Sequence, residues 1–230
     1  MKLSIMNQKL IGILGGTFNP VHSAHINIAL AAIKYMHLEQ IQFIPCMVPP
    51  HKTTKNVIPF QLRVDLLQAA IQGNPLLSIN TIESILPQPS YTWNMLNYWK
   101  KLHTLHQPLF ILSDEDFAML DTWYNGLELP SITNFLIIPR STNKKQSFSS
   151  TLKRFWNCTT IIQDRHNKMV SYASIFKNLY CFFLNTPIMD IRSSNIRSAW
   201  KGGVYLNHTM PTPVTKMLEY HQNILKKLWK

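Results

Sequence analysis

The sequence is poor in acidic residues and contains no long apolar run. Its 230 residues include 11 Asp and Glu against 23 Lys and Arg, which gives a formal net charge of +12 at pH 7. Apolar runs such as residues 109–112 and 135–138 have the length of strands and are too short to cross a membrane. The apolar run at residues 10–14 is too short for a signal peptide, and Gly15-Gly16 follows it instead of a cleavage site. We therefore expect a cytoplasmic protein with no membrane partner.

Cysteine is also scarce. Cys46, Cys158 and Cys181 are odd in number, lie far apart and form no C-x-x-C pair. This spacing indicates neither a zinc site nor a disulfide framework. We interpret the three residues as buried or incidental thiols.

The excess of basic residues would suit a polyanion such as nucleic acid, a membrane surface or a phosphorylated small molecule. The basic residues are scattered, however, with only modest clusters at Lys144-Lys145 and Lys226-Lys227. This distribution is typical of a solvated surface, and we expect no nucleic-acid partner.

The hydrophobic content of 46% is sufficient for the core of one domain, and strand-like segments alternate with helix-like ones. The expected strands are residues 11–14, 41–44, 76–82, 109–112, 135–138, 159–162 and 181–184. The expected helices begin with Ser23 as N-cap, with Pro59 at the first helical position and with Ser90, and two more cover residues 195–200 and 214–228. Residues 141–150 are rich in Ser, Thr, Lys and Asn and are expected to form a mobile loop. The pattern predicts a doubly wound α/β fold, with a mostly parallel sheet and helices on both faces.

Residues 14–26 read LGGTFNPVHSAHI, so a glycine pair follows an expected strand and two histidines precede an expected helix. Ligand sites of parallel sheets lie beyond the carboxyl ends of the strands, where this stretch falls. Glycine lets the backbone approach a ligand, and the N-terminus of a helix favours an anion such as phosphate. His22 and His25 can face the same anion, to which each imidazole can donate a hydrogen bond and, when protonated, offer a charge. A metal site is the alternative, but no Cys or acidic third ligand lies nearby in the sequence.

The segment GGTFNPVHSAH is similar to the signature G-G-[ST]-F-D-P-x-H-x-G-H of the nucleotidylyltransferase superfamily. Further segments resemble, in order and spacing, elements of the bacterial nicotinate-nucleotide adenylyltransferases. They are VPPHK at 48–52, SYT at 90–92, residues 110–124 ending in TWY, PR at 139–140 and IRSSNIR at 191–197. The resemblance extends from about residue 10 to about residue 220, which is most of the chain.

This resemblance implies a Rossmann-like fold and the transfer of an adenylyl group from ATP to nicotinate mononucleotide, giving deamido-NAD and pyrophosphate. It implies that His22, His25 and Arg197 are catalytic, and that Mg²⁺ accompanies ATP, held by phosphate oxygens and water rather than by a protein cluster. The residues implied to bind ATP are Gly15, Gly16, Thr17, Phe18, His22, His25, Ser113, Glu115, Ser193, Ser194 and Arg197. The residues implied to bind nicotinate mononucleotide are Asn19, Lys52, Thr92, Trp123, Tyr124 and Arg140, with Trp123 stacked on the nicotinate ring. One domain is expected over residues 1–230, with residues 187–230 as a helical subregion that completes the ATP site.

The sequence departs from the family pattern at several positions. Asn19 stands for aspartate, Ala24 for glycine, Ser113-Asp114-Glu115 for G-x-D, Arg192 for serine and Ser194 for threonine. In the altered G-x-D element, Asp114 or Asp116 could replace the aligned Glu115. Arg192 could add phosphate affinity or face solvent, and Arg63 is left open between the surface and the site. Because both histidines and Arg197 are intact, we expect an active enzyme.

Two alternatives remain open. The chain could be an adenylyltransferase for another acceptor, nicotinamide mononucleotide or phosphopantetheine. It could also be a non-catalytic relative that binds nucleotides or nucleic acid, which the charge of +12 would suit. A homo-oligomer is a further open possibility.

Overall fold

The structure is a computed structural model that describes residues 9–50, 54–140, 144–176, 179–204 and 208–229. The described strands are β1 Leu10–Gly16, β2 Ile41–Pro45, β3 Leu77–Ile79, β4 Gln107–Ser113, β5 Asn134–Ile138, β6 Ile162–Gln163, β7 Val170–Phe176 and β8 Leu179–Leu184. Within this described part they form one sheet of eight strands in the order β3-β2-β1-β4-β5-β8-β7-β6. Neighbours from β3 to β8 run parallel, whereas β7 pairs antiparallel with both β8 and β6. The predicted doubly wound, mostly parallel sheet is confirmed.

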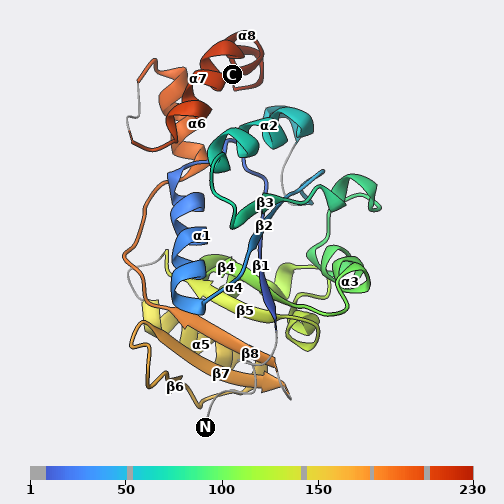
Figure 1. Cartoon of the computed structure of the whole chain (residues 1–230), viewed down its shortest axis with the longest axis vertical. Helices are drawn as coiled ribbons and strands as arrows, with labels where there is room; N and C mark the ends of the chain where they lie inside the picture. Colours follow the sequence, from blue (N-terminus) through green and yellow to red (C-terminus); the bar gives the residue numbers. More distant parts are fainter. Residues whose placement is uncertain (1–8, 51–53, 141–143, 177–178, 205–207, 230) are drawn as a thin grey trace.

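Helices cover both faces of this sheet, and Figure 1 shows α1 and α3 on its opposite sides. The described α-helices are α1 Ser23–Met36, α2 Phe60–Ile71, α3 Thr92–Leu102, α4 Asp114–Ala118, α5 Lys144–Trp156, α6 Ser193–Lys201, α7 Thr212–Tyr220 and α8 Gln222–Leu228. One buried cluster joins the sheet to α1, α2, α7 and α8, and a second joins it to α3, α4 and α5. Along β1, Ile11 and Ile13 enter the second cluster and Leu14 the first. Because successive residues of a strand point to opposite faces, a sheet covered on both sides requires strands that are apolar throughout.

The position of β1 determines where the site forms. Strand β1 lies between β2 on one side and β4 on the other. The next two strands of the chain, β2 and β3, extend the sheet on one side of β1, and the strands from β4 onward extend it on the other side. At such a switch point the connections diverge from the carboxyl ends of the strands and leave a crevice for a ligand. The segment that follows Gly16 therefore starts at the floor of this crevice.

Several predicted boundaries are wrong. The N-cap of α1 is His22 rather than Ser23, Pro59 is the N-cap of α2 rather than its first residue, and α3 begins at Thr92 rather than at Ser90. The strand expected at residues 76–82 is shorter than predicted, because β3 covers only Leu77–Ile79. Ile82, the last residue of the expected strand, begins the 3-10 helix η3, Ile82–Ile85. The expected strand at residues 159–162 is reduced to β6, which begins at its last residue. The expected helix at residues 214–228 is two helices, separated at His221.

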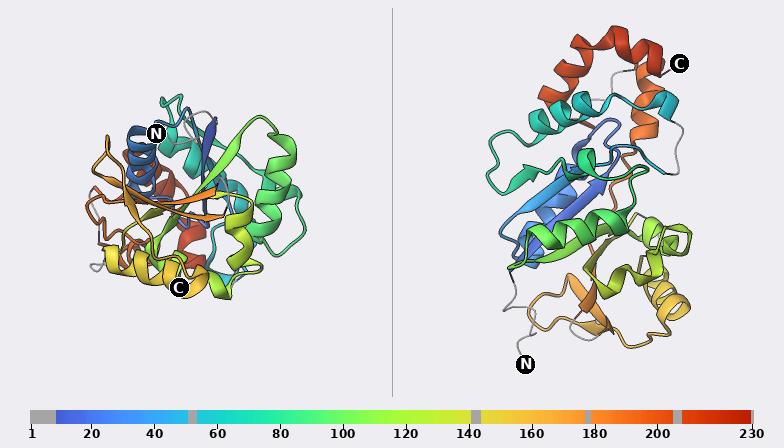
Figure 2. Two further views of the ribbon diagram at one scale, coloured as in Figure 1. Left: turned by 90° about the horizontal axis from the view of Figure 1, so that it is seen from below. Right: turned by 90° about the vertical axis from the view of Figure 1, so that its right-hand side faces the viewer.

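Two further segments differ in kind. Residues 144–150 of the expected mobile loop belong to helix α5, because Phe148 and Leu152 bury one face of it against the second cluster; residues 141–143 lie outside the described residues. Strand β7 was not predicted, because only Val170, Ser171 and Ala173 of it are buried and the apolar signal is weak. It turns the end of the sheet into an antiparallel unit, which lies at the opposite end of the molecule from α7 and α8 in the right-hand view of Figure 2.

The C-terminal helices pack beside α2. Val214 and Leu218 of α7 and Leu225 of α8 are buried in the same cluster as the α2 leucines, and the rings of Trp200 and Trp229 meet edge to face at 6.1 Å. This packing places the N-terminal end of α6 near the end of β1, as Figure 1 shows. The helical part of the predicted C-terminal subregion therefore borders the crevice.

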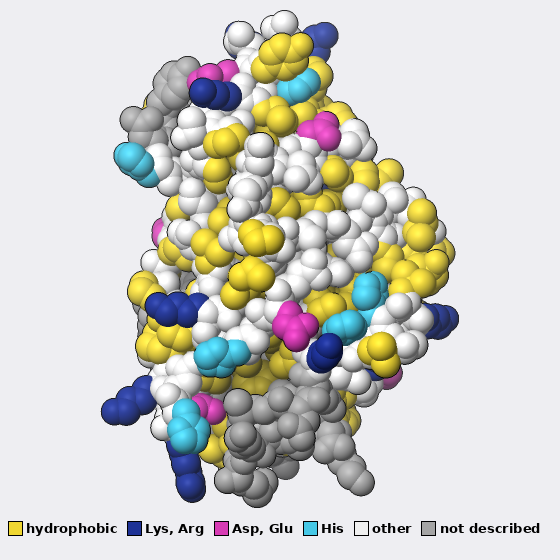
Figure 3. All heavy atoms as spheres, viewed as in Figure 1, with side chains coloured by type: hydrophobic (Ala, Val, Ile, Leu, Met, Phe, Trp, Pro, Cys, Tyr) yellow, Lys and Arg dark blue, Asp and Glu magenta, His cyan; other side chains and the backbone are white. Residues whose placement is uncertain are grey.

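Charged side chains on the face drawn in Figure 3 are dispersed among apolar and neutral ones, without a basic stripe. Of the described helices, none is both long and apolar enough to span a membrane.

Candidate active site

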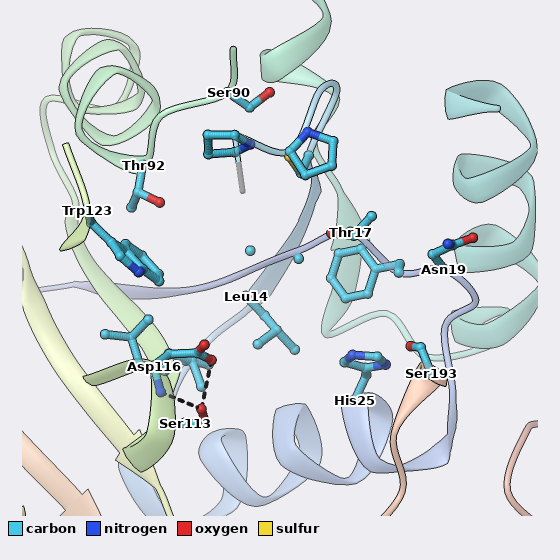
Figure 4. Close-up of a pocket in the computed structure, with 18 of the residues that line it drawn as sticks. Leu14, Thr17, Asn19, His25, Ser90, Thr92, Ser113, Asp116, Trp123 and Ser193 are labelled. Atoms are coloured by element: carbon cyan, nitrogen blue, oxygen red, sulfur yellow. Dashed lines mark hydrogen bonds between the residues drawn. The ribbon is translucent and has the colours of Figure 1, made fainter. Parts of the chain in front are cut away.

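A single large cavity, of about 1170 Å³, collects most of the residues named from the sequence. Figure 4 shows His25 and Ser193 on one side of it, with Thr92 and Trp123 across the cavity. Between them, Leu14 forms part of the floor, and Ser113 with Asp116 lies below Trp123. The cavity therefore has two chemically different walls, which we call the histidine wall and the aromatic wall.

The histidine wall begins with the loop after β1. Phe18 adopts a left-handed backbone conformation, with φ of 49°, and its buried ring meets His25 edge to face at a centroid distance of 5.0 Å. A Cβ atom on Gly16 would lie 3.1 Å from the Phe18 ring, so glycine allows this close packing. Phe18 lines the cavity, but its ring belongs mainly to the core and orients His25.

His22 and His25 come together at the start of α1. Their rings stack at a centroid distance of 3.7 Å, and the His22 backbone N–H donates to Nδ1 of His25 over 3.2 Å. Because Nδ1 of His25 accepts this bond, the proton of a neutral His25 ring lies on Nε2. Burial, with the positive charge of Arg140 as a second cause, lowers the pKa of His22 to about 3. His22 is therefore neutral at pH 7 and acts as a hydrogen-bonding group rather than a cation.

The start of α6 completes the histidine wall. Ser193 Oγ donates to the carbonyl of Pro20 over 2.9 Å, and Nη1 of Arg197 donates to the carbonyl of Asn19 over 2.9 Å. Ser194 lines the cavity as well. These bonds hold the N-terminus of α6 against the loop after β1, so two helix N-termini converge on the same space.

The ends of β4 and β5 differ in part from the sequence-based prediction. Glu115, aligned with the family aspartate, does not line the cavity and instead pairs with Arg192. Asp116 takes its place at the cavity, where its carboxylate accepts from Ser113 Oγ over 2.7 Å. The reason is local: Ser113 caps α4, so the carboxylates that follow it point in different directions around the helix.

Arg140 follows β5 and lines the cavity near His22. Its backbone N–H donates to Oδ1 of the buried Asp114 over 2.7 Å, and its guanidinium donates to the carbonyl of Ile191 over 3.4 Å. Its charge acts on His22, so it stands with the histidine wall rather than with the aromatic residues.

The aromatic wall comes from two segments that are remote in the sequence. Tyr91 and Tyr124 pack with ring centroids 4.8 Å apart at the rim, and Trp123 is half-buried against the second core cluster. Thr92, the first residue of α3, lines the cavity beside them. Lys52, predicted to contact the same substrate, lies outside the described residues.

Asn19 ties the loop after β1 to a second loop. Its side-chain Nδ2 donates to the carbonyl of Asn56 over 2.9 Å, and its Oδ1 accepts from the N–H of Ile58 over 3.0 Å. The two partners are one carbonyl and one N–H, so an amide satisfies both, whereas the aspartate of the family pattern has no donor.

The sequence reading missed the role of Arg63. Its side chain is 1% exposed and lies behind the cavity rather than in it. Its guanidinium donates to four backbone carbonyls of the described residues: those of Thr17 over 2.8 Å, Cys46 over 2.7 Å, Met47 over 3.2 Å and Ile58 over 2.9 Å. Nearby, the buried carboxylate of Glu83 accepts from the N–H of Met47 over 3.0 Å. A usable signal existed, since Arg63 shares the buried face of its helix with Leu66 and Leu67.

No group of three or more His, Cys, Asp or Glu side chains that could hold a metal occurs among the residues with described positions. The cavity instead offers ring N–H groups, helix N-termini and arginines on one wall and aromatic rings on the other. This arrangement defines a Rossmann-like site for a nucleotide, with an anion-binding side and a side that can hold a flat ring.

Comparison with known proteins agrees with this description. The model of the cytidylyltransferase-like family matches residues 13–199, and the chain therefore belongs to that family. Its relatives include proteins named "Probable nicotinate-nucleotide adenylyltransferase". One from Clostridium botulinum is 30% identical over 206 residues, covering 90% of this chain and 94% of the relative. One from Clostridium novyi is 29% identical over 200 residues, covering 87% and 91%.

Solved structures share the fold. The nicotinic acid mononucleotide adenylyltransferase of Plasmodium falciparum, complexed with NaAD, superimposes with a TM-score of 0.72 at 19% identity, over 94% of this chain and 97% of that one. The same enzyme complexed with APC gives a TM-score of 0.69 at 18% identity, over 94% and 96%. At this identity the likeness establishes the architecture.

We predict that Arg63→Lys lowers the free energy of unfolding by about 3 kcal/mol, because an ammonium group cannot reach the same set of carbonyls and leaves some of them buried without donors. Urea unfolding would measure the loss. The matched control is Arg154→Lys, because Arg154 pairs with Asp121 at the surface, and it should change stability by less than about 0.5 kcal/mol. Equal stability of the two variants would contradict the bracing role of Arg63.

We predict that Asn19→Asp destabilises the protein by about 1–2 kcal/mol, although aspartate is the family residue, because the carboxylate would face the Asn56 carbonyl without a donor. Asn74→Asp is the control, because the side-chain Oδ1 of Asn74 accepts from the N–H of Leu76 and aspartate keeps that bond. Thermal unfolding of both variants at pH 7 tests this, and an unchanged midpoint for Asn19→Asp would refute it.

We predict that His22 makes stability fall as the pH drops below about 6.5. Below this pH the histidine of the unfolded chain becomes protonated, whereas the native ring, with its pKa of about 3, stays neutral. The contribution of His22 to the free energy of unfolding is therefore complete above pH 6.5 and is lost toward pH 3. The expected loss at pH 5 is about 2 kcal/mol relative to pH 8. His22→Gln should lack this component in urea unfolding at a series of pH values, whereas His166→Gln, on the surface, should keep it.

Proposed function

We propose that the protein transfers the adenylyl group of ATP to nicotinate mononucleotide, forming deamido-NAD and releasing pyrophosphate. The observation that carries this proposal is the two-walled cavity. A triphosphate suits the histidine wall, where two helix N-termini and several cations or N–H donors converge. A planar ring suits Trp123 on the opposite wall.

The reaction needs positioning more than side-chain chemistry. A phosphate oxygen of nicotinate mononucleotide attacks the α-phosphorus of ATP in line, a new P–O bond forms, and the bond to pyrophosphate breaks. No protein nucleophile is required, so the rate depends on holding two anions in line and on stabilising charge at the equatorial and leaving oxygens. The histidine wall can hold the phosphates of ATP, and the aromatic wall can hold the ring of the second substrate. The two walls face each other across the cavity.

In this proposal, Thr17, His22 and His25 hold the phosphates nearest the reacting centre. Neutral His22 and the Nε2–H of His25 serve as donors that need no counter-charge. Ser193, Ser194 and Arg197 hold the leaving pyrophosphate, for which Arg197 would exchange its bond with the Asn19 carbonyl.

The second substrate occupies the aromatic wall. Trp123 stacks on the nicotinate ring, and Thr92 with the backbone at Tyr124 meets its carboxylate. Its phosphate must point toward the histidine wall, where Arg140 stands. Mg²⁺ enters with ATP as part of the substrate, bound by phosphate oxygens and water.

The direct test is pyrophosphate release with MgATP, comparing nicotinate mononucleotide with nicotinamide mononucleotide. We predict turnover that requires the acid and that falls at least a hundredfold in His22→Ala and in His25→Ala, because each loses a donor to the reacting phosphates. His166→Ala is the control for the loss of a histidine at the surface. Circular dichroism would confirm that each variant is folded.

The other outcomes point to specific alternatives. Equal use of the amide would indicate an enzyme with dual specificity. No release with either substrate, but release with phosphopantetheine, would indicate a different acceptor. Salt-sensitive binding of RNA or DNA without any turnover would favour a non-catalytic relative.

A further inference from the structure

Arg192 and Glu115 form an ion pair across the rim of the cavity. The guanidinium binds the carboxylate through two nitrogens, with Nη2 to Oε1 at 2.6 Å and Nη1 to Oε2 at 3.1 Å. A weaker contact of 3.4 Å joins Nε of Arg192 to Asp190. The pair links the first turn of α4 with the N-cap of α6, two elements that the sheet order brings to the same edge.

The two partners face different surroundings. Arg192 lines the cavity and directly precedes Ser193 at the start of α6, whereas Glu115 does not line the cavity. Their side chains are 41% and 38% exposed, so water screens the pair. A pair of this kind stabilises a protein little, even with good geometry. An arginine held by such a pair can change partner at low cost.

A better partner is available in the same cavity once a triphosphate enters. The guanidinium fork matches phosphate oxygens, and the start of α6 already favours an anion. The other cavity arginines are each engaged with backbone, Arg140 with the carbonyl of Ile191 and Arg197 with that of Asn19. Arg192 is engaged by an acidic side chain instead, which restricts its position without removing its charge.

We propose that Arg192 is an additional triphosphate-binding residue, which Glu115 holds at the rim in the free protein and releases to the β- and γ-phosphates when the nucleotide binds. This inference rests on the proposed function, because it assumes that ATP occupies the cavity. The two family positions that differ here, serine to arginine and aspartate to glutamate, are then one coupled change: the added arginine provides phosphate affinity, and the longer carboxylate reaches it.

The exchange makes opposite predictions for the two partners. Arg192→Ala removes a phosphate contact and should weaken MgATP binding about tenfold. Glu115→Gln removes the competing partner and should strengthen MgATP binding about twofold to threefold. The gain should disappear in the double variant, because it acts only through Arg192.

Calorimetric titration with MgATP, without the second substrate, measures all four proteins of this cycle. Titration with AMP provides the comparison ligand, for which Arg192→Ala should leave the affinity unchanged, since AMP lacks the β- and γ-phosphates. Arg154→Ala is the matched control: it breaks the surface pair with Asp121, neither partner of which lines the cavity, and should bind MgATP like the wild type.

Three results would overturn the inference. Weakening of similar size in Arg192→Ala and Glu115→Gln would mean that the pair itself braces the rim. Unchanged MgATP binding in Arg192→Ala would leave the arginine without a role in binding, and an equal loss for AMP would place its contact elsewhere on the nucleotide. The proposed function fails separately: wild-type protein that binds MgATP but releases no pyrophosphate with nicotinate mononucleotide would refute the acceptor and leave this cycle interpretable.

Discussion

The site depends on one buried guanidinium. Parallel strands end in loops that border the crevice, and a loop over a sheet edge has few backbone partners of its own. Arg63 supplies donors to the loop after β1 and to the segments after β2, so that two loops remote in sequence share one rigid partner. Asn19 repeats this connection from the other side, and the histidine wall is built on the loop they hold.

A buried charge is costly unless it is well compensated, and here the compensation is mostly dipolar. The carbonyls lie 2.7–3.2 Å from the guanidinium nitrogens, and Glu83 contributes a negative charge nearby. Burial lowers the pKa of Arg63 and raises that of Glu83, the expected directions for two charges removed from water. A hydrophobic residue would avoid that cost, but it could not hold the backbone of both loops.

The sequence predicted those features that depend on regular periodicity. Strands that are apolar throughout, such as residues 109–112 and 135–138, predicted the parallel sheet, and the glycine pair with two histidines predicted the location of the crevice. The failures have local causes. Helix α5 was missed because its polar composition outweighed the spacing of Phe148 and Leu152, and packing decided in favour of the helix. Likewise, sequence alignment cannot tell which of Asp114, Glu115 and Asp116 faces the cavity. Successive side chains of a helix point in directions that differ by about 100°, so a shift of one position in the alignment selects a different face.

The ends of the sheet have a consequence for the behaviour of the protein at high concentration. In the described part of the chain, a wide sheet ends in strands of three residues at β3 and two residues at β6. An edge strand exposes unpaired N–H and C=O groups that can pair with another chain, and the number of such groups grows with its length. Short edges therefore give a neighbouring molecule little backbone to extend, and this limits edge-to-edge aggregation.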